Sequence, residues 1–510
     1  MNRRIKAVCF TLVVCLALAV GFLITPSVTR TRTVAAASGN GVALTASSLP
    51  SNQTCDTSSP AQPYYVPCDV ANGSGASQTD FYDYSWQSFI ALNWPALSAS
   101  SGGQRGQPDP NGTLGPVGPL VWETYKQNTE VFLPQGAAPA DWNSTPPNPC
   151  GNLLGAKDFG KVMAVSRTTL NEVNQAGLTY GQFLGPLVDQ NSNYVVYEVR
   201  LNQSEFTYVV NTKYYNATNQ INAVKGATFQ IPPKTGKEFT TPLPTWATEG
   251  AVEVKAAWRV LDPVKDKNNM QRYYTREAYF VSQVGGKPVC QHLGTVGLIG
   301  LHILRLTSTT GKTWTWATFE QVDNTEINPN NPPNPPVPSL NPGPQGSPAP
   351  PYKPDGFCGS PYPPCQPAPT PIPAGAPLPA GAKPMNVSRW TPIPNAIAHA
   401  NGKYQAILPA PWSYYQLVAA VNPNTPGSPP PGCTVPFNPS VSPNVCVASN
   451  TTMESYKQST SCLTCHAKGT PQGVTTPNIK DFQIFTFLLQ EAQPAPSTRA
   501  KPAAASPKRY

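Results

Sequence analysis

Charged residues are scarce in this chain of 510 residues, in which Asp, Glu, Lys and Arg together make up only 12%. The formal net charge of +9 belongs to the two ends, because nine of the 35 cations precede the first acidic residue or follow the last one. The other 26 cations balance the 26 acidic residues. Surfaces that bind nucleic acid need clustered basic side chains. The body of the chain has no basic run, so nucleic acid is not expected as a partner.

Long helices and long apolar runs are also expected to be rare. Each of the 62 prolines lacks a backbone N–H and clashes inside a helix, which favours strands and loops. One apolar run stands out, Ala7–Ile24, which follows three basic residues and precedes the small residues 35–37. This order predicts that residues 1–37 form a signal peptide or an uncleaved N-terminal anchor. The protein is therefore expected in the periplasm or secreted, or held at the inner membrane by this segment.

The 12 cysteines agree with an oxidising compartment. Two lie in the N-terminal segment and two in a motif near the C-terminus, and the other eight allow up to four disulfides in 105 pairings. Short sequence separations favour three pairs and leave a fourth by elimination. The predicted disulfides are Cys55–Cys68, Cys358–Cys365, Cys433–Cys446 and Cys150–Cys290.

Shifts in composition divide the chain into segments. The proline-rich stretch is too poor in large apolar residues to form a core, so we interpret it as an extended spacer or surface loop. No internal repeat is present. After residues 1–37 the predicted segments are a flexible lead-in over 38–74, a β-rich domain over 75–328, a Pro-rich loop or linker over 329–384, a C-terminal segment over 385–490 and a disordered basic tail over 491–510.

Hydrophobic periodicity predicts a mainly β (α+β) fold with a few short helices. Apolar residues at helical spacing predict one helix over 81–94, and the capping-box spacing of Thr451–Glu454 predicts a second, short one. Alternating β-branched or aromatic residues predict strands, which we expect to form an antiparallel sandwich or a barrel-like sheet. The predicted strands cover residues 161–165, 194–201, 206–210, 251–261, 272–281, 296–305 and 313–319.

The strongest chemical motif is Cys462-Leu-Thr-Cys465-His466. Two thiols at this spacing add to the two vinyl groups of one haem, and the adjacent histidine becomes the proximal ligand of the iron. A redox-active dithiol is the alternative, but it is typical of a βαβ setting that the surrounding sequence lacks. The motif predicts one covalent haem c bound by Cys462, Cys465 and His466.

The second axial ligand is less defined, because no methionine or histidine follows His466. The ligand must come from upstream, or be absent. His302 lies in an apolar strand, where a buried imidazole needs a polar partner or a metal. It is the first candidate for the distal ligand, although a hydrogen-bonded core histidine is an equal alternative. Met453 is the second candidate. Only 44 residues follow His466, so the C-terminal segment is expected to pack on the β-rich domain, with the haem between them.

The chain resembles a family of bacterial exported proteins known only as single-haem cytochrome c family proteins. The resemblance implies a secreted or periplasmic haem protein and says little about any reaction. The long Pro-rich segment and the additional cysteines depart from the family pattern. The matching stretches are residues 83–95, 121–126, 197–202, 253–258, 300–303, 318–324, 450–454 and 461–466.

Electron transfer with an unidentified redox partner protein is the leading functional hypothesis, since a haem iron with two protein ligands cycles between ferric and ferrous states. A haem peroxidase or oxidase with an open distal position is the first alternative. It would use a distal base and a cation, and Arg305 is expected on the same strand face as His302. Whether the protein is an enzyme is left open.

Two further interpretations compete with electron transfer. In one, the β-rich domain binds a partner and the haem senses redox state or a gas, although the tryptophans of this domain are expected in the core. In the other, two carboxylates form a hydrolytic pair, but ion-paired carboxylates are the more common outcome, and sequence separation cannot place a pair at catalytic distance. The carboxylates considered are Glu249, Glu253, Glu320 and Asp323.

Overall fold

The structure is a computed structural model, and every structural statement below refers to the residues it describes. The N-terminal segment 1–37 and the cysteines Cys462 and Cys465 lie outside this part of the chain. The described residues are 46–145, 150, 162–164, 178–179, 182–183, 185–310, 314–325, 338–341, 360, 364, 366–367, 369–373, 376–421, 449–459, 466, 469–474 and 486–496.

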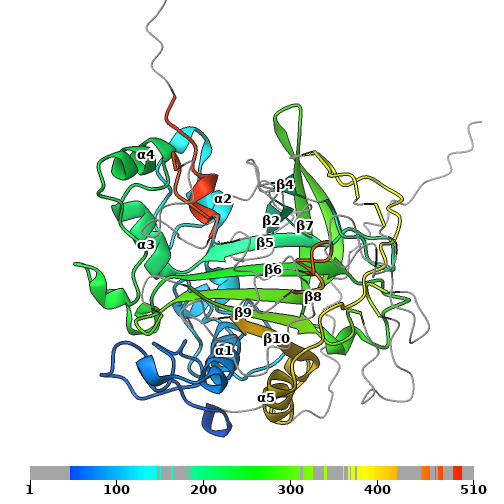
Figure 1. The fold of residues 1–510 in the computed structure, drawn as a ribbon, viewed down its shortest axis with the longest axis horizontal. Coiled ribbons are helices and arrows are strands. Elements are labelled where there is room, and N and C mark those ends of the chain that lie inside the picture. Colours follow the sequence, from blue (N-terminus) through cyan, green and yellow to red (C-terminus); the bar gives the residue numbers. More distant parts are fainter. Residues whose placement is uncertain are drawn as a thin grey trace, which may run out of the picture. The chain divides into compact units, whose positions relative to one another are not determined.

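A single large sheet organises the fold (Figure 1). Among the described residues it has eight strands in the order β1-β5-β6-β8-β7-β2, and β9 joins the second half of β8 and then pairs with β10. All pairings are antiparallel except that of β2 with β7. The strands are β1 Lys126–Gln127, β2 Val162–Ala164, β5 Val196–Leu201, β6 Val252–Val260, β7 Thr275–Val284, β8 Lys287–Leu306, β9 Trp314–Gln321 and β10 Tyr415–Val421; β3 Leu178–Thr179 and β4 Gln182–Phe183 form a separate hairpin.

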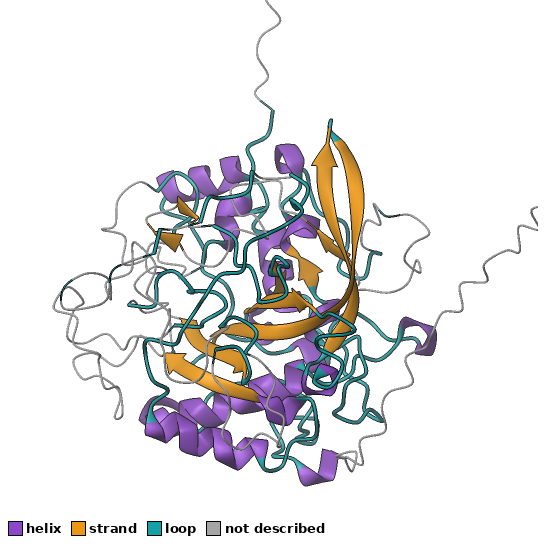
Figure 2. Cartoon of the chain, turned by 90° about the vertical axis from the view of Figure 1, so that its right-hand side faces the viewer, coloured by secondary structure: helices purple, strands orange, loops and turns teal. Residues whose placement is uncertain are grey.

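The 20-residue strand β8 connects two parts of this sheet. Its first half pairs with β7 in a long hairpin (Figure 2), whose turn at Gly285 and Gly286 has the positive φ angles that favour glycine. Its second half lies between β6 and β9, and there His302 is directly opposite Lys255 and Thr318. Opposed residues share a face of the sheet, so these three side chains point the same way.

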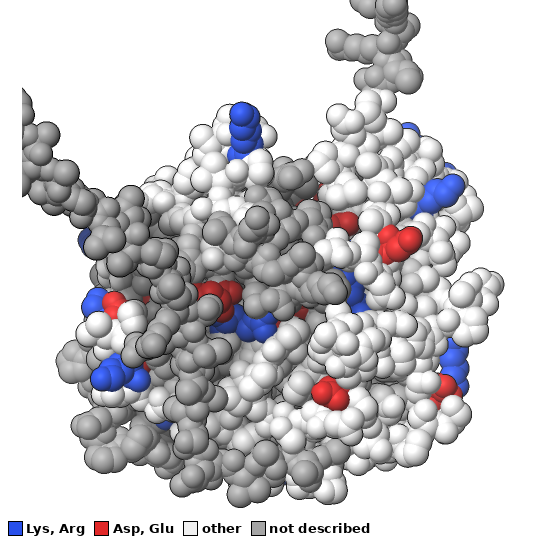
Figure 3. Space-filling model, turned by 180° about the vertical axis from the view of Figure 1, so that it is seen from behind, with Lys and Arg blue, Asp and Glu red and all other residues white. Residues whose placement is uncertain are grey.

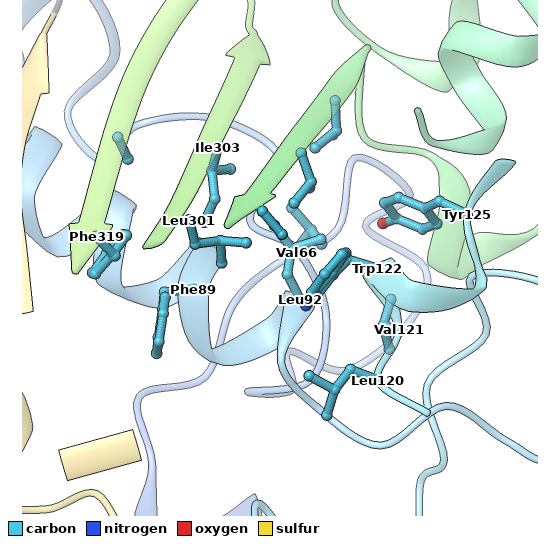
Figure 4. Packing of buried hydrophobic residues seen from close by; sticks show 14 of the residues in the cluster. Val66, Phe89, Leu92, Leu120, Val121, Trp122, Tyr125, Leu301, Ile303 and Phe319 are labelled. Carbon is cyan, nitrogen blue, oxygen red and sulfur yellow. The ribbon is translucent and has the colours of Figure 1, made fainter. Parts of the chain in front are cut away.

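Helix α1, with α5 packed beside it, covers the face of β8, β9 and β10 opposite to His302. Helix α1 begins after a capping box between Ser77 and Asp80, and its Phe89 ring lies 4.4 Å from that of Phe319 on β9. Leu301 and Ile303 of β8 belong to the same buried cluster (Figure 4). The helices are α1 Gln78–Leu92, α2 Asn128–Val131, α3 Gln203–Asn211, α4 Ala217–Lys225 and α5 Asn395–Gln405, of which α1 and α5 both contact β10.

The prediction of a mainly β fold with few short helices is confirmed, as is a helix within 81–94. Six of the seven predicted strands are confirmed, as β2 and β5 to β9. The exception is the strand predicted over 206–210. Neither a sandwich nor a barrel occurs in the described residues, which form one open eight-stranded sheet with helices against it and the separate β3–β4 hairpin. Strand β10 belongs to segment 385–490 and pairs with β9 of segment 75–328, so both segments build this sheet.

Two predictions of secondary structure were wrong. Residues 206–210 belong to helix α3, because the side chain of Asn202 caps the helix by accepting from Glu205 N, and Phe206 and Val209 face the core. The side-chain and backbone contacts therefore outweigh the strand propensity of the valines. Residues 451–454 form hydrogen-bonded turns and not a helix, although Glu454 does accept the Asn450 N–H as a capping residue would.

Two of the predicted disulfides are present, Cys55–Cys68 and Cys150–Cys290. The cysteines of the other two predicted pairs lie outside the described residues. Nowhere in the described chain is there a helix long and apolar enough to cross a membrane. On the face shown in Figure 3, basic and acidic side chains are few and are interspersed.

Candidate functional site

The C-terminal segment lies on the face of the sheet that points away from α1. Asn450 donates from its side-chain amide to the Thr318 hydroxyl and to the Phe319 carbonyl, both at 2.9 Å. The Thr451 N–H donates to Glu320 Oε1 at 2.6 Å. Gly300 makes this approach possible, because a Cβ at this position would collide with the Thr452 hydroxyl. A glycine in the middle of β8 thus allows the segment to pack closely on the sheet.

His466 is the described residue of the Cys-Leu-Thr-Cys-His motif, and its half-buried imidazole lies between two aromatic contacts. Its ring centroid is 4.1 Å from that of Trp316 on β9 and 5.0 Å from that of Phe487. Its carbonyl accepts the Gly469 N–H at 2.8 Å. The motif histidine is therefore positioned by the sheet on one side and by the final part of the C-terminal segment on the other.

His302 projects from β8 on the same face. It is 2% exposed, and its Nε2 has no hydrogen-bond partner. The nearest acidic atom to it is Glu454 Oε2 at 3.6 Å, beyond hydrogen-bond range. Its ring centroid lies 6.2 Å from that of Trp316. Trp316 is thus the common neighbour of the two imidazoles, and its own indole N–H is buried without a partner.

Met453 is placed differently. It is 1% exposed and packs in an apolar cluster with Tyr197, Ile299 and Tyr456. Its thioether is part of the contact between the C-terminal segment and strands β5 and β8. Ring contacts connect His302 through Trp316 to His466, whereas Met453 and Trp316 belong to separate buried clusters. His302, the first distal candidate, therefore shares an aromatic neighbour with the motif histidine, and Met453, the second, packs in an apolar cluster.

The other histidines lie elsewhere. His292 is exposed on the β7–β8 hairpin and forms a 2.7 Å contact with Glu277, and His399 is exposed on α5. The expectation that Arg305 shares a face with His302 was wrong. The two residues are three positions apart, and alternation along a strand places them on opposite faces. Arg305 instead donates to the Pro67 carbonyl at 2.9 Å and lies over the ring of Tyr84.

Three of the four carboxylates considered for hydrolysis accept hydrogen bonds from an arginine or an asparagine side chain. Glu320 pairs with Arg389, Asp323 accepts two hydrogen bonds from Arg272 at 2.6 and 2.7 Å, and Glu249 accepts from Asn202 at 2.9 Å. These contacts explain the carboxylates as structural groups. The fourth, Glu253, has a different environment.

Glu253 on β6 and Glu205 in the first turn of α3 form a buried pair of carboxyl groups. They are 5% and 1% exposed. Burial raises the pKa of Glu253 from 4.5 to about 7. Burial and the neighbouring Glu253 carboxylate raise the pKa of Glu205 well above its ordinary value. The Thr486 hydroxyl donates to Glu253 Oε2 at 2.8 Å.

Sequence reasoning did not identify Trp316, Phe487 or the Glu205–Glu253 pair as parts of this face. The aromatic residues looked like ordinary core residues, and Trp316 is indeed buried. The carboxyl pair has no local signal, since 48 positions separate its members. Only the register of β6 and the cap of α3 bring them together.

Two described imidazoles on this face have the chemistry of axial ligands to a haem iron. His466 supplies an imidazole against aromatic rings. The Nε2 of the buried His302 has no hydrogen-bond partner and lies 3.6 Å from Glu454 Oε2, and it has the chemistry of a second nitrogen ligand. A buried nitrogen without a hydrogen-bond partner costs about 1–3 kcal/mol, and iron coordination would remove that cost. Among the described residues, no cluster of three or more His, Cys, Asp or Glu side chains is arranged to hold a metal ion by itself.

No family model, curated protein or solved structure matches the chain.

Proposed function

We propose that the protein binds one haem c covalently through Cys462 and Cys465, with His466 as the proximal iron ligand, and that it transfers electrons. The observation that carries the proposal is the motif itself. Its histidine, His466, lies against the sheet with its ring in contact with Trp316 and Phe487. When bound, the haem supplies a one-electron ferric/ferrous couple. The donor and acceptor of that electron are proposed to be an unidentified redox partner protein.

The chain's own residues have three tasks in this proposal. Trp316 and Phe487 restrict the orientation of the His466 ring. His302 offers its Nε2 as the distal ligand from strand β8. The C-terminal turns around Asn450 close the face against water through their hydrogen bonds to β9. Rigid strands under both imidazoles would keep the ligand geometry alike in the two oxidation states, which favours rapid electron transfer.

Electron transfer is preferred over peroxidase or oxidase chemistry because Arg305, the cation expected beside His302, is not on this face. Arg305 lies on the opposite side of the sheet. The carboxylates Glu320 and Asp323 are engaged in ion pairs and are not arranged as a hydrolytic pair. Export by the segment 1–37, as a cleaved signal or as an inner-membrane anchor, belongs to the same proposal, since c-type haem is attached outside the cytoplasm.

The test is the optical spectrum of protein produced with a cytochrome c maturation system. Covalent haem is expected to survive denaturation and acid extraction, and Cys462→Ser/Cys465→Ser is expected to lose it. A reduced spectrum of low-spin type that carbon monoxide does not change would indicate two protein ligands. Rapid carbon monoxide binding would favour the open-site enzyme or gas-sensor alternatives. A protein without covalent haem under these conditions would contradict the proposal.

The distal ligand is tested by His302→Ala. This variant is expected to convert the spectrum to high-spin type and to admit carbon monoxide, because the distal nitrogen is lost. Met453→Leu is the matched control, since it retains the apolar volume of the cluster while removing the thioether. If Met453→Leu opens the site and His302→Ala does not, the assignment of His302 is wrong.

A further inference from the structure

The buried pair Glu205–Glu253 lacks the partners that two ionised carboxylates would need. Among the described residues, no Lys or Arg charge lowers the pKa of either group, and one oxygen of each, Glu205 Oε2 and Glu253 Oε1, has no hydrogen-bond donor. An unpaired buried carboxylate is strongly unfavourable. A proton shared between the two groups removes the problem, because it makes one carboxyl a donor to the other.

Other titratable groups on the surrounding elements do not replace that proton. On α3, Tyr208 donates its hydroxyl proton to the Gln230 carbonyl at 2.7 Å. On β6, the Lys255 ammonium lies 5.5 Å from the Tyr197 ring, and on β8 His302 is opposite Lys255 in register. The Thr486 hydroxyl, which donates to Glu253, is neutral.

Thr486 connects the pair to the loop that carries His466. Its hydroxyl donates to Glu253 and accepts the Leu488 N–H at 2.9 Å. Its backbone lies against Gly469, where a Cβ would collide with the Thr486 carbonyl oxygen. Gly469 in turn donates its N–H to the His466 carbonyl at 2.8 Å. The next residue, Phe487, touches the His466 ring. One hydrogen bond to Thr486 and one ring contact of the next residue, Phe487, therefore connect Glu253 to the motif histidine.

We infer that the Glu205–Glu253 pair is a proton-binding site whose occupancy is coupled to the oxidation state of the haem, which rests on the function proposed above. When an external one-electron donor reduces the ferric iron to ferrous, the site gains one negative charge. The singly protonated pair then takes up one proton from solvent and becomes two neutral carboxylic acids. On oxidation the electron leaves to the acceptor and the proton returns to solvent, so the charge of this region stays constant.

The experiment measures the midpoint potential of the haem-loaded full chain across a pH range centred on about 7, the Glu253 value. Reduction favours proton binding, so the potential is expected to fall as pH rises through this range. The limit of one proton per electron is about 59 mV for each tenfold change in proton concentration. Redox-difference infrared spectra provide the second reading, in which a protonated carboxyl band is expected to grow on reduction.

Glu205→Gln and Glu253→Gln are expected to flatten the pH dependence of the potential and to remove the carboxyl band. Glu277→Gln is the matched control, because Glu277 is an exposed carboxylate on the β7–β8 hairpin. Thr486→Val keeps both carboxyls but removes the hydrogen bond, and it is expected to weaken the coupling even if the glutamine variants fail to fold.

The outcomes separate the two proposals. Covalent haem with a potential that does not change with pH, and no carboxyl band, would overturn the proton site and leave electron transfer intact. The proton site is equally overturned if Glu277→Gln alters the titration as much as Glu253→Gln. Absence of covalent haem would reject the proposed function, and the inference with it.

Discussion

Single buried residues determine what the described face of the sheet can do. His302 Nε2 and the indole N–H of Trp316 are buried without hydrogen-bond partners, while neighbouring polar groups such as Glu320 are saturated with donors. A buried polar group without a partner calls for an explanation, such as an ordered water, a bound ion or a functional role. The same reasoning applies to the Glu205–Glu253 pair, whose raised pKa values follow from burial without a cation.

Protonation of Glu253 predicts a pH-dependent stability that needs no haem. The native carboxyl, with a pKa of about 7 against an ordinary 4.5, binds a proton that the unfolded chain releases. The free energy of unfolding is therefore highest below about pH 4.5 and falls as pH rises through about 7. Each tenfold difference in proton affinity is worth about 1.4 kcal/mol, so this loss is roughly 3 kcal/mol.

The free energy of unfolding of the Glu253→Gln variant is expected to fall less between about pH 4.5 and pH 7 than that of the wild type, because an amide does not ionise. Urea unfolding followed by tryptophan fluorescence at several pH values measures the difference. Glu277→Gln, on the exposed hairpin, should follow the wild-type curve. Parallel curves for Glu253→Gln and the wild type would show that the carboxyl titrates normally.

At the scale of elements, β8 is the strand on which the proposed site depends. One of its faces packs on α1 through Leu301 and Ile303, and the other presents Gly300 and His302 to the C-terminal segment. The absence of a side chain at Gly300 brings the turn at Asn450 and Thr452 against the sheet. Close backbone approach is a recurrent reason for glycine within a strand.

Gly300→Ala is therefore expected to destabilise the protein, because its methyl group would collide with the Thr452 hydroxyl. Overpacking of this kind costs about 1–3 kcal/mol. Gly402→Ala is the matched control: it lies in α5 with open space around its Cβ position, and alanine should stabilise that helix by about 0.5–1 kcal/mol. Chemical unfolding of both variants measures the effects, and an unchanged Gly300→Ala midpoint would mean that the turn is not packed as described.

On the scale of the whole described chain, distant segments are joined by pairing and by covalent links. Strand β10 near residue 420 pairs with β9 near residue 317, and the Cys150–Cys290 disulfide spans 140 positions. The Cys55–Cys68 disulfide spans only 13. The longer cross-link removes more conformational freedom from the unfolded chain.

Loss of the long disulfide is accordingly expected to cost more stability than loss of the short one. The chain-entropy relation assigns about 5 kcal/mol to Cys150–Cys290 and about 3 kcal/mol to Cys55–Cys68. The denaturant midpoints of two double variants, Cys150→Ser/Cys290→Ser and Cys55→Ser/Cys68→Ser, test which disulfide contributes more stability. An equal or reversed order would indicate that local packing, and not loop closure, dominates.

The amino-acid sequence alone was sufficient for features that depend on near neighbours. Helical spacing located α1, alternation located β5 to β9, and a short separation paired Cys55 with Cys68. The haem motif is likewise a local pattern of two thiols and a histidine, and haem attachment stays a prediction. Such features are readable because periodicity and short loop closure act within a few residues.

Only the tertiary structure decided the features that depend on register and on distant contacts. In the folded chain residues 206–210 are helical, and Arg305 lies on the face of the sheet opposite His302. Trp316 contacts the rings of both His302 and His466. It also gave Glu320 an arginine partner and left Glu253 with another carboxyl. The physical reason is that the charge state and ligand chemistry of a buried group depend on which distant side chains share its desolvated surroundings, and no local pattern records them.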